Sequence, residues 1–384
     1  MAIPFPARAH ASFGDARSSP GRHRLEASGI ALVVILTYIA SPVPAEVARA
    51  RAPVQAAPPT VGADISLDAG DEIAPHRARP TRSSRQPEPL APSPPADGRD
   101  APDPFILADG ERYVLFTTQV GLRNVPVATS HDLRDWSPPS DALPQLPEWA
   151  AWGRTWAPGV TRLAGKYLLY FAADHQASGR QCIGVAAAAD PTGPYHPTAP
   201  DPLVCQTRLG GSIDPHPFVD EDGTAHLLWK ADGNAVGQPS TRFSARQRSD
   251  GMALAGEPVA LLTSGTAWEQ PLIENPAMVV VGGSYVLLYS GGWWESAGYA
   301  IGYAACTSPV GPCTRVTVDG PLVASAGGEA GPGGACVVVG SAGDQWLAYH
   351  SWASHAVGYD AGGVRSLRFA SLTWRGDEPV VTRV

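Results

Sequence analysis

The chain has 384 residues, of which 44% are hydrophobic, and its formal net charge is −8. This composition provides enough apolar material for a large buried core. Outside the first hundred residues there is no run of basic side chains, which argues against nucleic acid as a partner.

The first 45 residues are typical of a secretory signal. Residues 1–28 are polar with several Arg and His, residues 29–40 form a short apolar run, and Ser41–Ala45 supplies small residues and prolines. The apolar run is too short for a comfortable transmembrane helix. We therefore predict secretion without stable membrane insertion, and a membrane anchor through residues 29–40 is the alternative.

Residues 46–98 are dominated by Pro, Ala, Arg and Ser and contain almost no aromatic side chains. Such a segment buries too little apolar surface to offset the entropy lost on ordering. We predict a disordered linker here, followed by a folded catalytic domain over residues 99–384.

The rest of the chain repeats one pattern five times. Each copy has a short apolar strand, a turn that contains glycine, and a second strand that closes on an aromatic residue. A further apolar run follows each hairpin. The closing aromatics are spaced by 54, 59, 60 and 60 residues, and they are Phe116, Tyr170, Trp229, Tyr289 and Tyr349. Repeats of this period, built from short strands, predict an all-β fold, a five-bladed β-propeller.

One position of the repeat carries the candidate chemistry. It lies 13 to 15 residues before the closing aromatic and is occupied by Asp103, Trp156, Asp214, Glu274 and Ala335. If the first strand of each blade is innermost, these side chains meet at one end of the central channel. Asp103 and Asp214 each precede a proline, so a plain turn role is the alternative for both. Glu274 has no such turn role.

Clustered carboxylates are costly to keep in a cavity unless they are used. One protonated and one ionised carboxyl group, placed on either side of a sugar, are what glycoside hydrolysis requires. We therefore predict that Asp103, Asp214 and Glu274 are catalytic.

Four further residues are candidates for substrate binding. Trp156 is either a stacking platform for a sugar ring or a core aromatic. Trp294 follows the fourth hairpin and either reaches a subsite or packs between blades. His350 either lines the channel wall or is a structural histidine. Phe105 stands beside Asp103 and completes the set.

The five cysteines contain no C-x-x-C pair, which argues against structural zinc. In an exported protein, Cys182 with Cys205 and Cys306 with Cys313 would each close a loop as a disulfide. Cys336 begins the fifth inner strand, and we expect it to be a buried free thiol.

Several phrases of the sequence resemble glycoside hydrolase family 43. They are PDPF at Asp103, TWAPGV at Trp156, SIDPHPFVDEDG at Asp214, IENPAMVVVGGSYVLLYSGGWW at Glu274, DLRDW and GPGGA. The resemblance implies an inverting mechanism, with Asp103 as general base, Glu274 as general acid, and Asp214 orienting the acid and tuning its pKa. An inverting pair stands roughly 6.5–9.5 Å apart.

One departure concerns metal binding. Many members of the family carry a His after Gly-Pro-Gly in the last blade, near a bound calcium, and here that position is Gly334. We therefore predict no metal and no other cofactor.

The SGGWW run, followed by YAIGYAAC and SPVGPC, resembles the arabinan-directed branch of the family. This resemblance implies an exo-acting α-L-arabinofuranosidase whose substrate is a plant cell-wall polysaccharide or oligosaccharide such as arabinan or arabinoxylan, and we expect a monomer. The alternatives are an endo-1,5-α-L-arabinanase, then a β-xylosidase. From another class, a carbohydrate-binding propeller without catalysis would keep the aromatic platform but would not need three acids.

Overall fold

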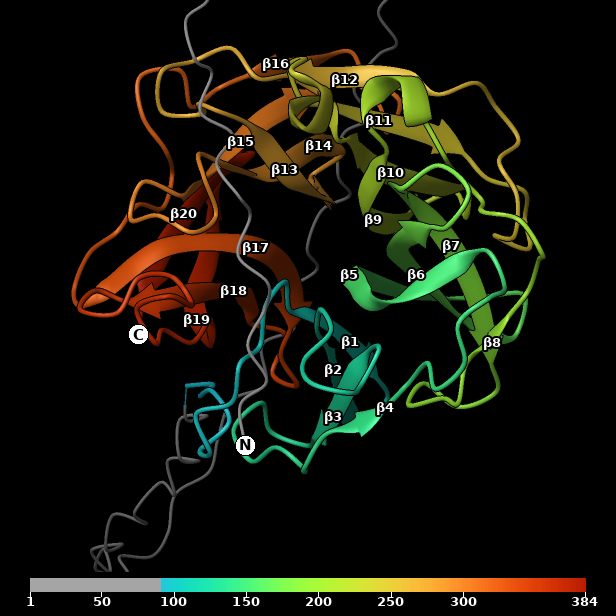
Figure 1. Cartoon of the computed structure of the whole chain (residues 1–384). Helices are drawn as coiled ribbons and strands as arrows, with labels where there is room; N and C mark the ends of the chain where they lie inside the picture. The colour runs from blue at the N-terminus through green and yellow to red at the C-terminus, as the bar shows by residue number, and fades with distance from the viewer. Residues whose placement is uncertain (1–90) are drawn as a thin grey trace, which may run out of the picture. The chain divides into compact units, whose positions relative to one another are not determined.

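The computed structural model describes residues 91–384, which form a five-bladed β-propeller around a central channel (Figure 1). The predicted signal and residues 46–90 of the predicted linker lie outside the described residues. Each blade is a four-stranded antiparallel sheet whose strands follow one another in chain order. The five-bladed prediction is therefore confirmed.

The first strand of each blade lies nearest the channel and the fourth lies at the rim. Blade 1 is β1 (Phe105–Asp109), β2 (Arg112–Phe116), β3 (Pro126–Ser130) and β4 (Ser140–Asp141). Blade 2 is β5 (Ala150–Leu163), β6 (Lys166–His175), β7 (Arg180–Ala188) and β8 (His196–Pro197). Blade 3 is β9 (Ser212–Val219), β10 (Ala225–Ala231), β11 (Thr241–Arg246) and β12 (Val259–Thr263). Blade 4 is β13 (Ile273–Val281), β14 (Ser284–Gly291), β15 (Ala300–Cys306) and β16 (Cys313–Arg315). Blade 5 is β17 (Glu329–Val339), β18 (Gln345–Ala353), β19 (Ser366–Arg375) and β20 (Glu378–Arg383).

Two short 3-10 helices, η1 (Thr207–Leu209) and η2 (Gly233–Val236), lie in the connections of blades 2 and 3. The search of residues 91–384 found no helix with the length and apolar character needed to cross a membrane.

The inner hairpins form where the turn signals predict them. In each blade a glycine between the first and second strands has a positive φ, such as 62° at Gly110 and 82° at Gly223. Glycine adopts this left-handed conformation without the steric cost that a side chain brings. Two inner strands are longer than the others. β5 begins at Ala150, and β17 begins at Glu329 rather than at the predicted Cys336; each has two irregularities in its pairing with the second strand.

The core is divided among the interfaces between blades. Five apolar clusters fill them, one for each pair of neighbouring blades. The aromatic that closes each second strand is buried in one of these clusters, with an exposure of 0% or 1% for Phe116, Tyr170, Trp229, Tyr289 and Tyr349. The repeated aromatic therefore packs one blade against the next.

Within the described residues, the ring closes without a strand shared between blade 5 and blade 1. Apolar packing between these two blades is supplemented by the segment that leads into β1. There Ala101 N–H donates to the Arg365 carbonyl at 2.8 Å, and the Asp100 carboxylate accepts from Arg365 N–H and from the Tyr359 hydroxyl, both at 2.7 Å. Contacts of this segment begin before the predicted boundary at residue 99, because Ser93 already bonds blade 1 through Leu133 and Trp136.

Both predicted disulfides are present, Cys182–Cys205 in blade 2 and Cys306–Cys313 in blade 4, and Cys336 is a buried free thiol. Burial raises the pKa of the Cys336 thiol to about 12, so it stays protonated.

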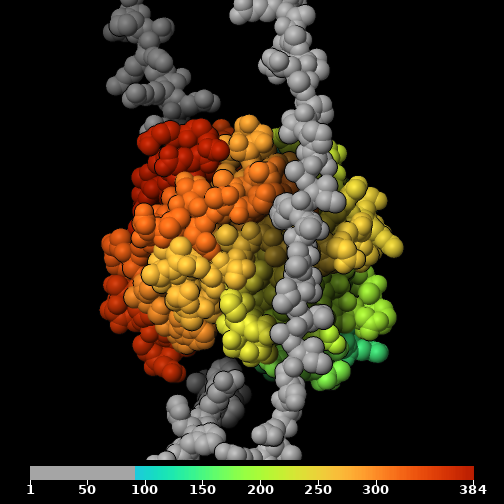
Figure 2. Space-filling view, turned by 90° about the horizontal axis from the view of Figure 1, so that it is seen from above, coloured from blue at the N-terminus to red at the C-terminus, as the bar shows by residue number. Residues whose placement is uncertain are grey.

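Seen after a quarter turn, the yellow, orange and red segments of the later blades form one continuous flank of the molecule (Figure 2).

Candidate active site at the channel mouth

Five residues with left-handed backbone surround the channel where the inner strands begin. Their φ angles lie between 43° and 60°, and they are Asp103, Ala157, Asp214, Asn275 and Gly334, one from each blade. Four of them precede a proline, and positive φ is uncommon for residues with a side chain. Asp103 and Asp214 are therefore structurally equivalent. Trp156 and Glu274 lie one residue before the equivalent position and Ala335 one residue after it, which corrects the predicted alignment of the repeats.

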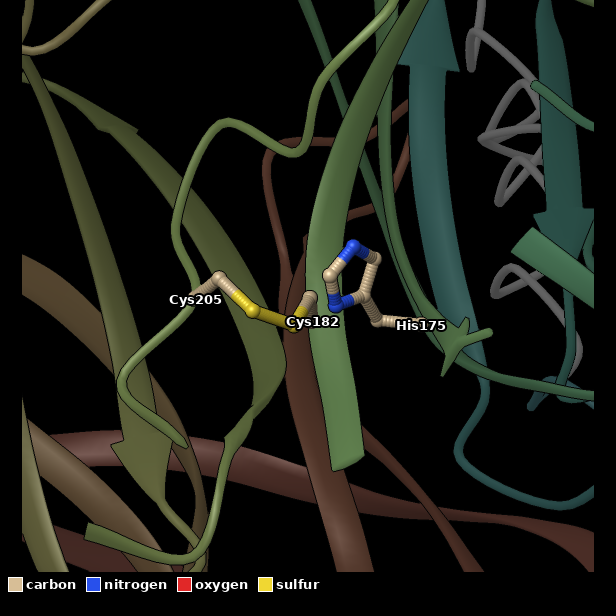
Figure 3. Close-up of side chains that lie close together, drawn as sticks. All are labelled: His175, Cys182 and Cys205. Carbon is tan, nitrogen blue, oxygen red and sulfur yellow. A yellow bond between two sulfur atoms is a disulfide. The ribbon is translucent and has the colours of Figure 1, made fainter. Parts of the chain in front are cut away.

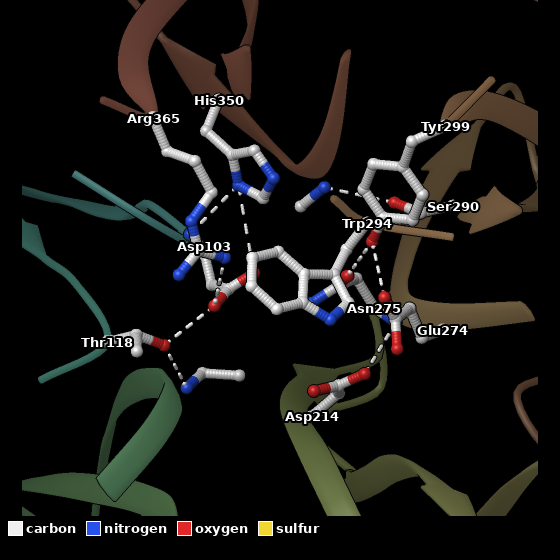
Figure 4. A network of polar contacts seen from close by, with 12 residues as sticks. Asp103, Thr118, Asp214, Glu274, Asn275, Ser290, Trp294, Tyr299, His350 and Arg365 are labelled. Carbon is white, nitrogen blue, oxygen red and sulfur yellow. Dashed lines mark hydrogen bonds and ion pairs between the residues drawn. The ribbon is translucent and has the colours of Figure 1, made fainter. Parts of the chain in front are cut away.

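The length of the inner hairpin explains the offset of Glu274. The chain has 11 residues between the paired His216 and Leu228 in blade 3, but 10 between the paired Ala277 and Leu288 in blade 4. Bulges are present in both blades. The pairing of the first and second strands shifts between Glu274 and Ala277, and it also shifts beside Lys230 and around Gly333. A bulge places an extra residue on one strand and re-aims the side chains next to it. As a result, Glu274 and Asp214 reach the same place although they differ by one position in the repeat (Figure 4).

A small cavity of about 30 Å³ is enclosed by the five left-handed residues and those that follow them. Its wall includes the carboxylates of Asp103 and Asp214, and most of the rest is proline, glycine, alanine and Phe105. Glu274 does not line this cavity, but its carboxylate lies near Asp214 and Asn275 in Figure 4, so the three predicted acids lie at one end of the channel, from blades 1, 3 and 4.

Hydrogen bonds from blade to blade hold this ring. In four of the five blades, the backbone N–H of the left-handed residue donates to a side chain of the preceding blade. The pairs are Ala157 N–H to Thr118 Oγ1 at 2.7 Å, Asn275 N–H to Asp214 Oδ2 at 2.8 Å, Gly334 N–H to Ser290 Oγ at 3.0 Å and Asp103 N–H to His350 Nδ1 at 3.0 Å. Each strained residue is therefore fixed by its neighbour.

Asp103 lies in a mainly neutral environment. Its Oδ2 accepts a hydrogen bond from the Thr118 hydroxyl at 2.7 Å, and the Arg365 guanidinium is 3.7 Å from the same oxygen. The side chain is 16% exposed, which leaves it open to the mouth. Burial lowers the pKa of the adjacent His350 to about 3, so that imidazole is neutral and adds no charge to the site.

Glu274 is held at both carboxylate oxygens. Lys230 Nζ lies 3.0 Å from Oε2, and the Tyr299 hydroxyl lies 2.8 Å from Oε1. Lys230 is 1% exposed and also contacts Asp232 at 2.9 Å. Arg242, fully buried on β11, donates to the backbone carbonyl of Glu274 at 2.9 Å. The position of Glu274 is thus fixed from three sides.

The protonation of the acids follows from burial. Loss of solvent, together with the neighbouring Glu274 carboxylate, raises the pKa of Asp214 to about 8 in spite of the Lys230 charge. Two carboxyl groups in one buried site do not both ionise readily. The pair formed by Asp214 and Glu274 therefore retains a proton near neutral pH, whereas Lys230 stays charged because its carboxylate partners outweigh burial and raise its pKa to about 12.

This site can be compared with known proteins. The model of glycosyl hydrolases family 43 matches residues 95–379, which is most of the chain. The chain belongs to this family. An extracellular endo-α-(1→5)-L-arabinanase of Bacillus subtilis is 28% identical over 245 residues, covering 55% of this chain and 49% of that protein. A β-D-galactofuranosidase of Aspergillus niger is 28% identical over 198 residues, covering 48% and 53%.

The chain therefore spans about half the length of these curated relatives. Among solved structures, a thermostable family-43 glycoside hydrolase is 26% identical and superimposes with a TM-score of 0.65, covering 75% of this chain and 94% of that chain. The family assignment agrees with the five-bladed architecture and with the resemblance in the sequence.

The aromatic candidates occupy different places in this family-43 site. Trp294 is half-buried, the Arg365 guanidinium lies 4.8 Å from its ring, and in the view of Figure 4 its indole stands between Asp103 and the other two acids. Trp156 is half-buried, and Arg154 lies 4.8 Å from its ring. Phe105 lines the cavity, and its ring centroid is 6.0 Å from that of His216.

His350 is completely buried, and its ring contacts Asp103 through the backbone rather than lying on the surface of the mouth. The structure thus places it as a support of Asp103. Because the ring is not exposed at the mouth, it is not placed for the predicted contact with substrate.

Sequence reasoning missed Thr118, Lys230, Tyr299 and Arg365. One signal was available for Lys230: it directly follows the closing aromatic of its blade, as His350 and Ser290 do in theirs. All three lie on second strands, and each reaches the inner strand of the next blade. Tyr299 and Arg365 lie in connections between strands, and no regular spacing marks them.

The absence of a metal from the channel stays a prediction. Calcium takes six to eight oxygen ligands, and the side chains with oxygen atoms in the cavity wall are Asp103, Asp214 and Asn275. Gly334 has no side chain, and the Nδ1 atom of neutral His350 already accepts a hydrogen bond, so its proton is on Nε2. We route no chemical step through a metal.

One other group has the composition of a metal site. His175, Cys182 and Cys205 have candidate ligand atoms within 4.8 Å of one another (Figure 3). The two sulfur atoms are joined in the disulfide, so neither is a thiolate available to a metal.

Proposed function

We propose that this chain is an inverting glycoside hydrolase that removes α-L-arabinofuranosyl units from arabinan or arabino-oligosaccharides. One observation carries the proposal: carboxylates from three blades meet at the channel mouth, and two of them share a buried site that retains a proton. A proton donor and an ionised acceptor facing one sugar are the requirements of an inverting hydrolase.

The roles follow from the surroundings. Asp103 is open to the mouth and lies beside the Thr118 hydroxyl. It takes a proton from the attacking water while the water oxygen forms a bond to the anomeric carbon. The glycosidic C–O bond breaks, and Glu274 gives its proton to the departing oxygen. Asp214 orients this residue through Asn275 N–H and keeps a proton in the pair. Water supplies the new hydroxyl group, and the anomeric configuration inverts.

The choice of substrate is supported by the relatives. One is named for α-(1→5)-linked L-arabinan and another for β-D-galactofuranosides. The first is also named extracellular, which accords with the proposal that this chain is secreted. Trp294 beside the acids supplies an apolar face for a sugar ring, as aromatic side chains in carbohydrate sites do.

Endo-acting arabinanase activity is the second candidate. The arabinanase relative favours it directly, since that relative is named as an endo-acting enzyme. The two activities give different products from linear arabinan, because exo-action releases monomer from the first minutes and endo-action releases a ladder of oligomers.

The test is a panel of substrates with wild-type protein. Nitrophenyl α-L-arabinofuranoside, nitrophenyl β-D-xyloside, nitrophenyl β-D-galactofuranoside and linear arabinan are each incubated, and arabinan products are resolved by chromatography. Proton NMR of the first product decides the anomer. We expect arabinose of inverted configuration. Retention of configuration removes the inverting mechanism, and sugar binding without turnover on any substrate favours a non-catalytic propeller.

A further inference from the structure

Two buried aromatic rings lie beneath the channel mouth, one from blade 4 and one from blade 5. Tyr299 and His350 stack with centroids 6.0 Å apart and planes inclined by 12°, and their exposures are 1% and 0%. An added Cβ at Gly333 would stand 1.9 Å from the Tyr299 ring, and one at Gly334 would stand 2.7 Å from His350 Nδ1. The stacked pair thus occupies the space that side chains at these two glycines would fill.

The two ends of this stack contact two different acids. His350 Nδ1 accepts the backbone N–H of Asp103 at 3.0 Å, and the Tyr299 hydroxyl lies 2.8 Å from Glu274 Oε1. The same hydroxyl also lies 2.8 Å from Asn275 Oδ1, so its single proton is shared between these two acceptors. A continuous chain of contacts therefore runs from the backbone of Asp103 through two rings to the carboxylate of Glu274.

We propose that Tyr299 and His350 are positioning residues that set the separation and orientation of Asp103 and Glu274. The proposal rests on the proposed function, in which these two acids are base and acid. An inverting reaction needs room for one water molecule between base and sugar, so the separation has narrow limits. A displacement of about 1 Å in a reacting group costs on the order of 100-fold in rate.

The stack also supplies one of the polar contacts of the Glu274 carboxyl group. The charged and titratable groups around this carboxyl group are Lys230 on β10, Asp214 on β9, Arg242 on β11 and Tyr299 ahead of β15. Burial raises the pKa of Tyr299 well above its ordinary value, so its hydroxyl remains a donor. The Tyr299 hydroxyl therefore adds a neutral donor to a carboxyl group that otherwise faces charged or acidic side chains.

Tyr299→Phe is the first test, because it keeps the ring and removes only the hydroxyl. We expect kcat to fall about 10- to 100-fold with KM within about threefold. Tyr303→Phe is the matched control, since Tyr303 is 8% exposed on the nearby β15 and the charges that act on its hydroxyl are those of Glu378 and Asp377, not those of the three acids. A Tyr299→Phe enzyme with the kcat of the control overturns the proposal.

His350 is tested by two variants that each keep one half of its contacts. His350→Phe keeps a ring for the stack and removes the acceptor for Asp103 N–H, whereas His350→Asn keeps an acceptor oxygen near the place of Nδ1. We expect the Phe variant to lose about 10- to 100-fold in kcat and the Asn variant to lose less. Equal kcat in the Phe variant and wild type contradicts the proposed support of Asp103.

A structural readout separates this inference from the proposed function. Crystal structures of wild type and Tyr299→Phe give the distance between the Asp103 and Glu274 carboxyl groups whether or not any substrate is turned over. We expect a displacement of Glu274 of about 0.5 Å or more. An unmoved carboxyl group overturns the positioning role, and an inactive wild type with a displaced carboxyl group overturns only the proposed function.

Discussion

On the side of the channel mouth formed by blades 3 and 4, a buried lysine contacts Glu274 directly at 3.0 Å. On the side formed by blades 5 and 1, the nearest cation is Arg365, 3.7 Å from Asp103, and the direct contacts of that carboxylate are neutral. The first side carries buried charges that depend on one another. The second side carries one accessible carboxylate in a frame of hydrogen bonds.

The comparison teaches that one repeat produces two kinds of environment. Both sides place a side chain from the second strand of one blade against the inner strand of the next, Lys230 in one case and His350 in the other. Because the lysine is charged and the histidine neutral, substitutions on the blade 3–4 side change electrostatics and stability. Substitutions on the blade 5–1 side change geometry.

The largest expected effect comes from removing each acid in turn. Glu274→Gln and Asp103→Asn should each lower kcat on arabinan by about 10²- to 10⁴-fold, because each removes one proton transfer. Nitrophenolate leaves with little help from an acid, so Glu274→Gln should lose much less on the nitrophenyl substrate than on arabinan. Asp103→Asn should lose similarly on both, and steady-state kinetics on the two substrates would falsify the assigned roles if the pattern were reversed.

Lys230→Met tests whether the buried charge on the blade 3–4 side of the mouth stabilises the fold. It leaves Glu274 and Asp232 without their shared cation, and breaking a buried ion pair from one side costs about 3–5 kcal/mol. The folded-state pKa of Lys230 is about 12, above its ordinary value, so its contribution is fully present below pH 10.5 and is lost as the pH rises through 12. The full difference in the free energy of unfolding between the variant and wild type should therefore be present at pH 7.

Urea unfolding at pH 7 measures this effect. Lys166→Met on β6 is the control, since Lys166 is exposed and should change the free energy of unfolding by less than about 0.5 kcal/mol. A Lys230→Met protein as stable as this control would mean that the buried cation is not needed to hold the two carboxylates.

The sequence predicted the features that depend on local signals. Glycine turns such as Gly110, alternating apolar strands and a recurring aromatic act within some twenty residues, and they gave the blades correctly. The contacts of Tyr299 and Arg365 exist only after distant blades meet, and nothing local marks them. The offset of Glu274 was misread for a physical reason: counting back from the aromatic assumes hairpins of equal length, and the hairpin of blade 4 is one residue shorter than that of blade 3.

Asp214→Asn tests the shared proton by its dependence on pH. The variant keeps an oxygen to accept Asn275 N–H and imitates the protonated acid. Because the folded-state pKa of Asp214 is raised to about 8, its contribution to stability is fully present below the ordinary value near 3.8 and is lost as the pH rises toward 8. About four pH units at about 1.4 kcal/mol each predict that the variant gains about 5 kcal/mol over wild type between pH 4 and pH 9. A difference that does not change with pH would show that Asp214 is ionised throughout.

The smallest expected effect concerns the closure between blades 5 and 1. Asp100→Ala removes the acceptor for Arg365 N–H and the Tyr359 hydroxyl, and so leaves both donors of the closing segment without their partner. One of these hydrogen bonds is exposed and the other is part-buried, and each contributes about 1 kcal/mol. Asp97→Ala, three residues earlier, removes only an ion pair with Arg99 in which Asp97 is 54% exposed, and exposed pairs contribute about 0–1 kcal/mol.

Thermal unfolding of the two variants separates a closing contact from an ordinary surface charge. Asp100→Ala should have the lower Tm, and it should also lower kcat several-fold, because Tyr359 and the backbone of Arg365 hold the guanidinium that faces Asp103. Asp97→Ala should leave kcat unchanged. If both variants unfold and react alike, the ring is closed by apolar packing of blades 5 and 1 alone, and the environment of Asp103 does not depend on the segment that precedes it.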